Sequence, residues 1–214
     1  MRLVLPRLYV ILDAALISSP ERDCAASLAE AGVRLLQYRN KSAPARQYLE
    51  SSRALAETLV PGGVSFFVND RPDVAFLAGA SGVHVGQEDL AVEQTRRVIG
   101  RDRLVGVSTH NLEQFDRAAT SSADYIAVGP IFGTSSKANP DPVVGLAFLR
   151  RVRGLTEKPI VAIGGITLER AAGAIEAGAD SVAVIGGILS AADPAQRARQ
   201  YITTLEAAKH AATF

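Results

Sequence analysis

The chain has little cysteine, no excess of either charge and no long hydrophobic run, and each shortage excludes a class of protein. Its 214 residues include one cysteine, Cys24, so no disulfide can form within the chain. The 23 basic and 22 acidic residues leave a formal charge of +1, which argues against a general nucleic-acid or anionic-membrane surface. No apolar run approaches the roughly 18 residues of a transmembrane helix. Because Arg2, Arg7 and Asp13 interrupt the apolar start, we expect no signal peptide and a cytoplasmic protein.

A repeated pattern of short apolar strand and amphipathic helix runs along the chain. Strands are expected at 8–12, 33–39, 64–68, 82–85, 104–107, 125–128, 160–163 and within 178–185. Parallel strands need crossover connections, so this alternation predicts a parallel sheet. Eight repeats predict closure into a single (β/α)8 TIM-barrel domain spanning residues 1–214. The alternative is an open doubly wound sheet, but its glycine-rich loop usually follows the first strand, which here ends Leu12-Asp13-Ala14.

Two glycine pairs, Gly164-Gly165 and Gly186-Gly187, follow the last two expected strands. Glycine lets backbone N–H groups approach an anion closely, and the loops after strands seven and eight commonly form the phosphate site of a barrel. A single pair would be better explained by a turn after a buried strand. Two pairs on consecutive strands favour a phosphate site.

Two carboxylates follow neighbouring strands. Asp70 comes after the third expected strand and Asp89 after the fourth. A few carboxylates completed by water and substrate phosphates are typical of Mg²⁺ coordination. Each residue alone has a structural interpretation, since Asp70 precedes the turn at Arg71-Pro72 and Asp89 could cap a helix. As an adjacent pair beside cations, they favour a metal site.

Three cations are expected near these carboxylates. Arg39 and Lys41 share the loop after the second strand, and Lys137 belongs to a long loop spanning 133–145. Arg can grip a diphosphate bidentately, and Lys supplies a point charge. A long loop of turn residues at a barrel mouth is often a lid. A diphosphate site beside a monophosphate site suits a reaction that joins two phosphorylated substrates.

Six motifs, in their order and spacing, resemble the thiamine phosphate synthase family. They are Gln37-Tyr-Arg-Asn-Lys41, Val68-Asn-Asp70, Gly82-Val-His-Val-Gly-Gln-Glu-Asp89, Gly106-Val-Ser-Thr-His110, Gly129-Pro-Ile-Phe-Gly-Thr-Ser-Ser-Lys137 and Ala162-Ile-Gly-Gly-Ile166. The resemblance covers nearly the whole chain, from Leu8 to about Tyr201. Short pieces such as Gly164-Gly165 are not specific, whereas the combination is.

The resemblance implies a Mg²⁺-dependent transferase. It would join 4-amino-2-methyl-5-hydroxymethylpyrimidine diphosphate to a thiazole phosphate through a dissociative, carbocation-like step, giving thiamine phosphate and diphosphate. Asp70 and Asp89 would bind Mg²⁺. The pyrimidine diphosphate would contact Gln37, Tyr38, Arg39, Asn40, Lys41, Asn69, Ser108 and Lys137, of which Arg39, Lys41, Ser108 and Lys137 are the implied catalytic residues. The thiazole phosphate would contact Thr134, Ser135, Ser136, Gly165, Ile185 and Gly186.

Other functions stay open at this point. Gly186 stands where better-known family members carry Ser, so a hydroxyl contact would be lost while a backbone N–H contact remains. A related thiazole tautomerase would use His110 as a proton carrier and would not need Asp70 and Asp89. A non-catalytic barrel that binds thiazole or thiamine phosphate is a third possibility. His84 is interpreted as structural, and the resemblance favours a homodimer.

Overall fold

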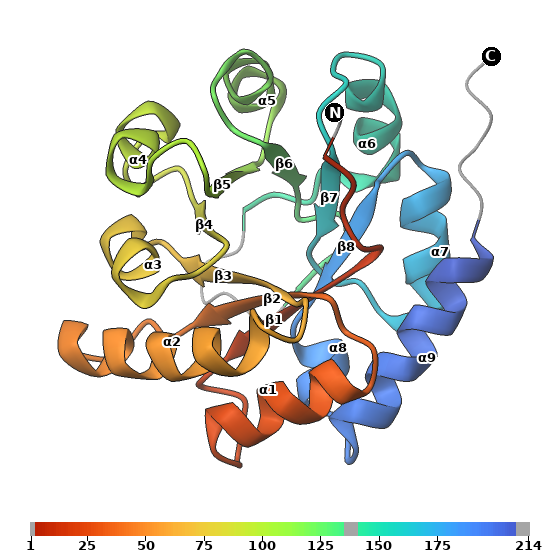
Figure 1. Cartoon of the computed structure of the whole chain (residues 1–214). Helices are drawn as coiled ribbons and strands as arrows, with labels where there is room; N and C mark the ends of the chain where they lie inside the picture. Colours follow the sequence, from red (N-terminus) through yellow and green to blue (C-terminus); the bar gives the residue numbers. More distant parts are fainter. Residues whose placement is uncertain (1–2, 135–140, 209–214) are drawn as a thin grey trace.

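Eight parallel strands close into a barrel in the computed structural model, which describes residues 3–134 and 141–208 (Figure 1). The strands are β1 (Leu8–Asp13), β2 (Leu35–Arg39), β3 (Ser65–Asn69), β4 (Gly82–Val85), β5 (Leu104–Thr109), β6 (Tyr125–Val128), β7 (Ile160–Ile163) and β8 (Ser181–Val184). Closure is visible at Val10, which is in register with Leu36 of β2 and with Val184 of β8. The expected (β/α)8 barrel is therefore confirmed, and an open sheet is excluded.

Helices surround the barrel in the order that the sequence pattern predicts. They are α1 (Glu21–Glu30), α2 (Ala45–Leu59), α3 (Pro72–Ala78), α4 (Val92–Ile99), α5 (Leu112–Thr120), α6 (Gly145–Arg153), α7 (Leu168–Glu176), α8 (Gly186–Leu189) and α9 (Pro194–Ala207). The Asn111 side chain caps α5 by accepting a hydrogen bond from the Gln114 N–H at 3.0 Å. The short helix α8 was not predicted, because four residues are too few to show a helical period.

Two strand boundaries differ from the sequence-based expectation by two residues, and the end of β1 and both ends of β3 differ by one. The second strand begins at Leu35 and not at Val33, because the Val33 N–H donates to Leu28 O at 3.1 Å and closes the turn after α1. The fifth strand continues to Thr109, two residues beyond the expected end. This extension carries Ser108 on the sheet itself, so its side-chain direction is fixed by strand geometry.

Two hydrophobic layers hold the fold together. The larger one lies between the strands and the surrounding helices. The smaller one fills the inside of the barrel, where the rings of Tyr9, Phe67 and Tyr125 meet edge to face with centroids 5.7–6.1 Å apart. Gly106 makes room for this cluster, since a Cβ there would overlap the Tyr125 ring. The aromatic cluster closes the barrel from within and forms the floor of the cavity above it.

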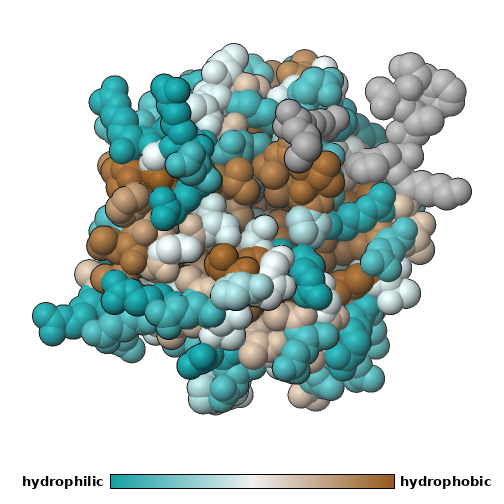
Figure 2. All heavy atoms as spheres, viewed as in Figure 1, coloured by the Kyte–Doolittle hydropathy of each residue, from teal (hydrophilic) through white to brown (hydrophobic). Residues whose placement is uncertain are grey.

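The molecular surface has both polar and apolar regions. On the face seen in Figure 2, hydrophilic side chains dominate the periphery and hydrophobic ones gather toward the middle. No helix in the described ranges is both long and apolar enough to cross a membrane.

Candidate active site

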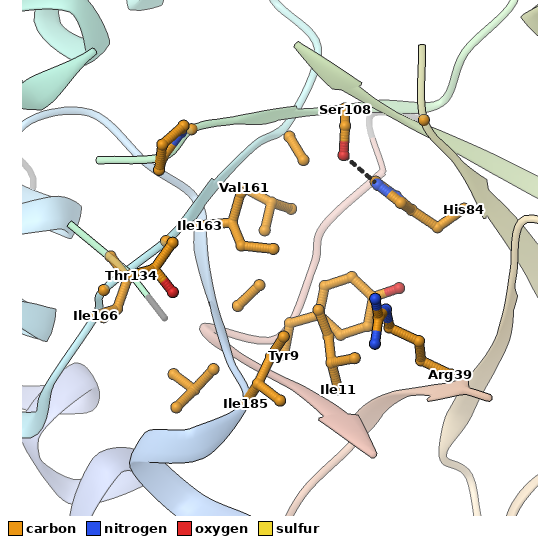
Figure 3. Close-up of a pocket in the computed structure, with 18 of the residues that line it drawn as sticks. Tyr9, Ile11, Arg39, His84, Ser108, Thr134, Val161, Ile163, Ile166 and Ile185 are labelled. Atoms are coloured by element: carbon orange, nitrogen blue, oxygen red, sulfur yellow. Dashed lines mark hydrogen bonds between the residues drawn. The ribbon is translucent and has the colours of Figure 1, made fainter. Parts of the chain in front are cut away.

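A cavity of about 780 Å³ opens at the C-terminal ends of the strands, and all eight strands contribute residues to its wall. Figure 3 shows its two unlike sides: Ser108, His84 and Arg39 lie on one, and Val161, Ile163, Ile166 and Ile185 on the other. A concave site with an apolar wall and a few convergent polar groups is typical of small-molecule binding. Its place at the C-terminal end of the barrel is that of barrel active sites in general.

The structure brings most of the sequence-predicted residues together around this cavity. The predicted residues that line it are Gln37, Arg39, Lys41, Asn69, Asp70, Asp89, Ser108, Thr134, Gly165, Ile185 and Gly186. Ser135, Ser136 and Lys137 lie outside the described residues. The remaining two, Tyr38 and Asn40, do not line the cavity.

Tyr38 and Asn40 instead support the loop after β2 from behind. Tyr38 points away from the barrel interior because successive side chains of a strand alternate, and Gln37 and Arg39 point inward. The Tyr38 hydroxyl donates to Glu21, and its ring lies 5.3 Å from that of Tyr48. Asn40 Oδ1 accepts the Ala43 N–H at 3.0 Å, which fixes the turn that carries Lys41. In the Gln37–Lys41 motif, neighbouring side chains of the strand point to opposite sides, so some face the cavity while others support the loop.

Arg39 is oriented by Asp13, a residue that sequence reasoning missed. Asp13 ends β1 and is 4% exposed, and its Oδ2 pairs with Arg39 Nη1. Its other oxygen accepts the Ala15 N–H at 3.0 Å, so the carboxylate is held from both sides. The signal available in the sequence was an acidic residue directly after the first apolar strand. Asp13 therefore positions the guanidinium at the polar side of the cavity.

Asp13→Asn is expected to raise the KM for a diphosphate substrate about tenfold, because Arg39 loses its charged partner and its orientation. Steady-state kinetics would measure this, and chemical denaturation would report stability. Asp180→Asn is the matched control, since Asp180 forms a similar ion pair with Arg153 at 2.7 Å at the opposite end of the barrel. Equal KM values in the two variants would contradict a positioning role for Asp13.

Asp70 and Asp89 meet at the ends of β3 and β4. Asp70 has a left-handed backbone with φ of 65° and pairs with Lys41. Asp89 Oδ2 accepts the Gly86 N–H at 2.7 Å, which turns the carboxyl back toward the cavity. Burial raises the pKa of Asp89, and the adjoining Asp70 carboxyl raises it further.

Two adjoining carboxylates suit a divalent cation between them. In the described part of the chain, no group of three or more His, Cys, Asp or Glu side chains is arranged to hold a metal. A metal here would therefore take most of its ligands from water and substrate, which is the usual mode for Mg²⁺ and not for Zn²⁺.

The two glycine loops lie on the apolar side. Gly164 and Gly165 have φ values of 97° and 62°, and a Cβ at Gly165 would approach Phe132 Cβ to 2.8 Å. The loops after β6 and β7 are thus packed backbone to backbone. Gly186 begins α8, and the first N–H groups of a helix have no partner within it, so they can bind an anion.

Arg170 and Asp141 are two of the cavity-wall residues that were not in the predicted set. Arg170 Nη1 donates to Gly165 O at 3.2 Å, and its guanidinium lies 4.8 Å from the centre of the Phe132 ring. It therefore places a cation beside the loop after β7. Nothing in the sequence marks Arg170, because it lies in the first turn of α7, five residues after Gly165. Asp141 also lines the cavity, and its Oδ2 is 3.5 Å from His110 Nε2.

Comparisons with known proteins agree with this geometry. The family model described as "Thiamine monophosphate synthase" matches residues 8–188. The chain is 52% identical over 209 residues to a "Thiamine-phosphate synthase" of Koribacter versatilis, which covers 95% of this chain and 97% of that one. It is 43% identical over 195 residues to the protein of the same name from Chloroflexus aurantiacus, with 91% and 90% covered. The solved structure of "Thiamine phosphate pyrophosphorylase from Pyrococcus furiosus" matches with a TM-score of 0.85 at 32% identity, covering 94% and 96%.

Proposed function

The chain belongs to the thiamine monophosphate synthase family and is a transferase of thiamine biosynthesis, and we propose how its cavity performs the transfer. Its two substrates are 4-amino-2-methyl-5-hydroxymethylpyrimidine diphosphate and a thiazole phosphate. The observation that carries this proposal is one cavity with a carboxylate and cation cluster on one side and two glycine loops on the other. A sugar-phosphate isomerase would need only one of these anion sites.

The pyrimidine diphosphate binds on the polar side. Arg39 and Lys41 contact its phosphates. Arg39 is positioned by its ion pair with Asp13, and Lys41 by its ion pair with Asp70. Gln37, Asn69 and Ser108 line the same side and hydrogen-bond the rest of the substrate. Lys137 contributes a further cation in this proposal. Preformed charges aimed at the leaving group stabilise the transition state more than the bound substrate.

Asp70 and Asp89 would hold Mg²⁺ on this side. The fit rests on the two adjoining carboxylates at the polar side of the cavity; burial raises the pKa of Asp89, and the Asp70 carboxyl raises it further. When bound, the ion would neutralise charge that develops on the departing diphosphate. Lys41 balances one carboxylate in its absence.

The thiazole phosphate binds on the glycine side. The N–H groups at the start of α8, beside Ile185 and Gly186, and the loop at Gly165 receive its phosphate, together with Thr134. Ser135 and Ser136 complete this set in the proposal. The thiazole ring then rests against the apolar wall and faces the pyrimidine. Figure 3 shows three isoleucines of this wall, Ile163, Ile166 and Ile185.

The reaction breaks one C–O bond and forms one C–N bond. The pyrimidine amino group pushes electrons toward the methylene carbon, and the C–O bonding pair leaves with the diphosphate. The lone pair of the thiazole nitrogen then adds to the cationic methylene carbon. Arg39 and Lys41 stabilise the leaving group, while the apolar wall keeps water from trapping the cation. The protein supplies positioning and charge, and no covalent nucleophile is needed.

The test is diphosphate release measured with and without the second substrate. We expect rapid release only when the thiazole phosphate is present, in equal amounts with thiamine phosphate. Release at the same rate without it would indicate hydrolysis, and no release from folded protein would exclude the transfer reaction.

A second candidate activity is thiazole tautomerisation. His110 Nδ1 donates to Gly129 O at 2.6 Å, which directs Nε2 toward Asp141 and the cavity. An imidazole held this way could move a proton on the thiazole. His110→Asn separates the two activities: it should abolish tautomerisation while sparing the transfer. Loss of transfer alone would contradict the assignment.

Gly186→Ser is expected to be tolerated and to lower the KM for the thiazole phosphate a few fold. A Cβ at this position would lie 3.6 Å from Ser190 Oγ, an ordinary contact, and the φ of Gly186 is not left-handed. The added hydroxyl would sit at the start of α8 and supply one more donor to the phosphate. Steady-state titration of the thiazole phosphate checks this, and a raised KM would place the phosphate elsewhere.

A further inference from the structure

A chain of hydrogen bonds crosses the floor of the cavity and ends at Ser108. Gln37 Nε2 is 2.8 Å from the Tyr9 hydroxyl, which is 3.0 Å from that of Tyr125. The Tyr125 hydroxyl is 2.9 Å from His84 Nδ1. His84 Nε2 is 2.8 Å from Ser108 Oγ, the bond drawn in Figure 3.

The three middle members are buried, so each polar atom needs its partner within the protein. Tyr125 is 0% exposed, Tyr9 1% and His84 7%. The aromatic rings are held edge to face, which fixes the hydroxyl positions. A buried donor without an acceptor is strongly unfavourable, so the hydrogens must be ordered along the chain.

The first link sets the direction of every other link. An amide N–H₂ can only donate, so the Tyr9 oxygen accepts from Gln37. In the described part of the chain the Tyr9 hydroxyl has no hydrogen-bond partner besides Gln37 and Tyr125, so the buried Tyr9 hydrogen points to Tyr125 and the Tyr125 hydrogen to His84 Nδ1. Because Nδ1 accepts from Tyr125, the His84 ring carries its hydrogen on Nε2 and donates it to Ser108 Oγ.

We propose that Tyr9, Tyr125 and His84 are positioning residues that orient the Ser108 hydroxyl as a hydrogen-bond donor into the cavity. Since Oγ already accepts from His84, its own hydrogen is available to a substrate acceptor, such as a phosphate oxygen or an unprotonated ring nitrogen. At the other end, the Gln37 carbonyl oxygen is left as an acceptor. This inference rests on the proposed function only for the identity of the substrate, the pyrimidine diphosphate.

The kinetic test compares Tyr125→Phe, Ser108→Ala and the double variant. Tyr125→Phe removes the donor to His84, so the Ser108 hydroxyl loses its fixed direction and the KM for the pyrimidine diphosphate rises about tenfold. The KM for the thiazole phosphate stays unchanged. The double variant should show the Ser108→Ala loss and no more, because both changes act on one interaction. Additive losses, or a Ser108→Ala variant with wild-type KM, would overturn the proposal.

A matched control and a second measurement keep the test independent of folding and of turnover. Ser181→Ala removes another buried hydroxyl bond, to Arg7 O at 3.3 Å at the other end of the barrel, and should leave both KM values unchanged.

In ¹⁵N-histidine NMR, we expect His84 as the Nε2–H tautomer with a hydrogen-bonded Nδ1. The Nδ1 resonance should move downfield in Tyr125→Phe.

An Nδ1–H tautomer in the wild-type protein would overturn the proposal, because the chain would then run the other way and Ser108 would donate to His84. This readout does not depend on the transfer reaction. Failure of turnover in the wild-type enzyme would contradict the proposed function, while the tautomer would still test the direction of the chain.

Discussion

Asp70→Asn should lower kcat about 100-fold or more and leave binding of the thiazole phosphate intact. The carboxylate adjoins Asp89 and pairs with Lys41, so its loss removes half of the proposed Mg²⁺ site and frees a lysine from its partner. Losing one group that stabilises developing charge typically reduces kcat by about 10²- to 10³-fold. The glycine loops lie on the opposite side of the cavity, so the second substrate keeps its site.

Asn is the informative replacement because Asp70 has a left-handed backbone with φ of 65°. Asn adopts this conformation readily, whereas Ala would add strain of about 1–2 kcal/mol and confuse a catalytic loss with a structural one. Initial rates at saturating Mg²⁺ measure kcat, and calorimetric titration measures thiazole-phosphate binding. Asp73→Asn is the control, since its exposed ion pair with Arg71 should contribute little. Parallel loss of turnover and binding in Asp70→Asn would indicate a collapsed site.

Gly165→Ala should raise the KM for the thiazole phosphate at least tenfold and lower the melting temperature. Gly165 has φ of 62°, and its Cβ would overlap the Gly133 carbonyl and lie 2.8 Å from Phe132 Cβ. The left-handed backbone alone disfavours Ala by about 1–2 kcal/mol, and the overlap forces apart the loops after β6 and β7. Both loops line the phosphate side of the cavity.

The control is a glycine of the same region without these constraints. Gly173 lies in α7 with open space around its Cβ position, so Gly173→Ala should stabilise the protein by about 0.5–1 kcal/mol and leave KM unchanged. Thermal melts and substrate titrations of the two variants give the comparison. A Gly165→Ala variant with wild-type KM would show that this loop does not bind the phosphate.

Much of the barrel could be predicted because its signals are local. Apolar strands and amphipathic helices repeat eight times, and the alternation itself requires parallel strands. Residues that follow the strands, including Asp70, Asp89 and Gly165, line the cavity because the carboxyl ends of parallel strands meet at one end of the barrel. The exact start of β2 could not be predicted, because it depends on one hydrogen bond from the Val33 N–H to Leu28 O, and the sequence pattern does not show this bond.

The unpredicted parts of the site depend on contacts between distant segments. Asp13 acquires its place by pairing with Arg39, 26 residues away. His84 was interpreted as structural, and the two contacts that define its place, with Tyr125 of β6 and Ser108 of β5, join separate strands. Tyr38 lies in the middle of a recognisable motif and still faces away from the cavity, because strand alternation separates neighbours. A motif identifies the segment, while the fold decides which of its side chains face the substrate.

The most direct test of the whole account is thiamine phosphate formation by the purified enzyme. The protein is incubated with both substrates and Mg²⁺, and the product is oxidised to its fluorescent thiochrome derivative. We predict a signal that requires both substrates, disappears with EDTA and returns when Mg²⁺ is restored. Folded protein that gives no signal under these conditions would contradict the transfer reaction, and a signal insensitive to EDTA would contradict the metal site at Asp70 and Asp89.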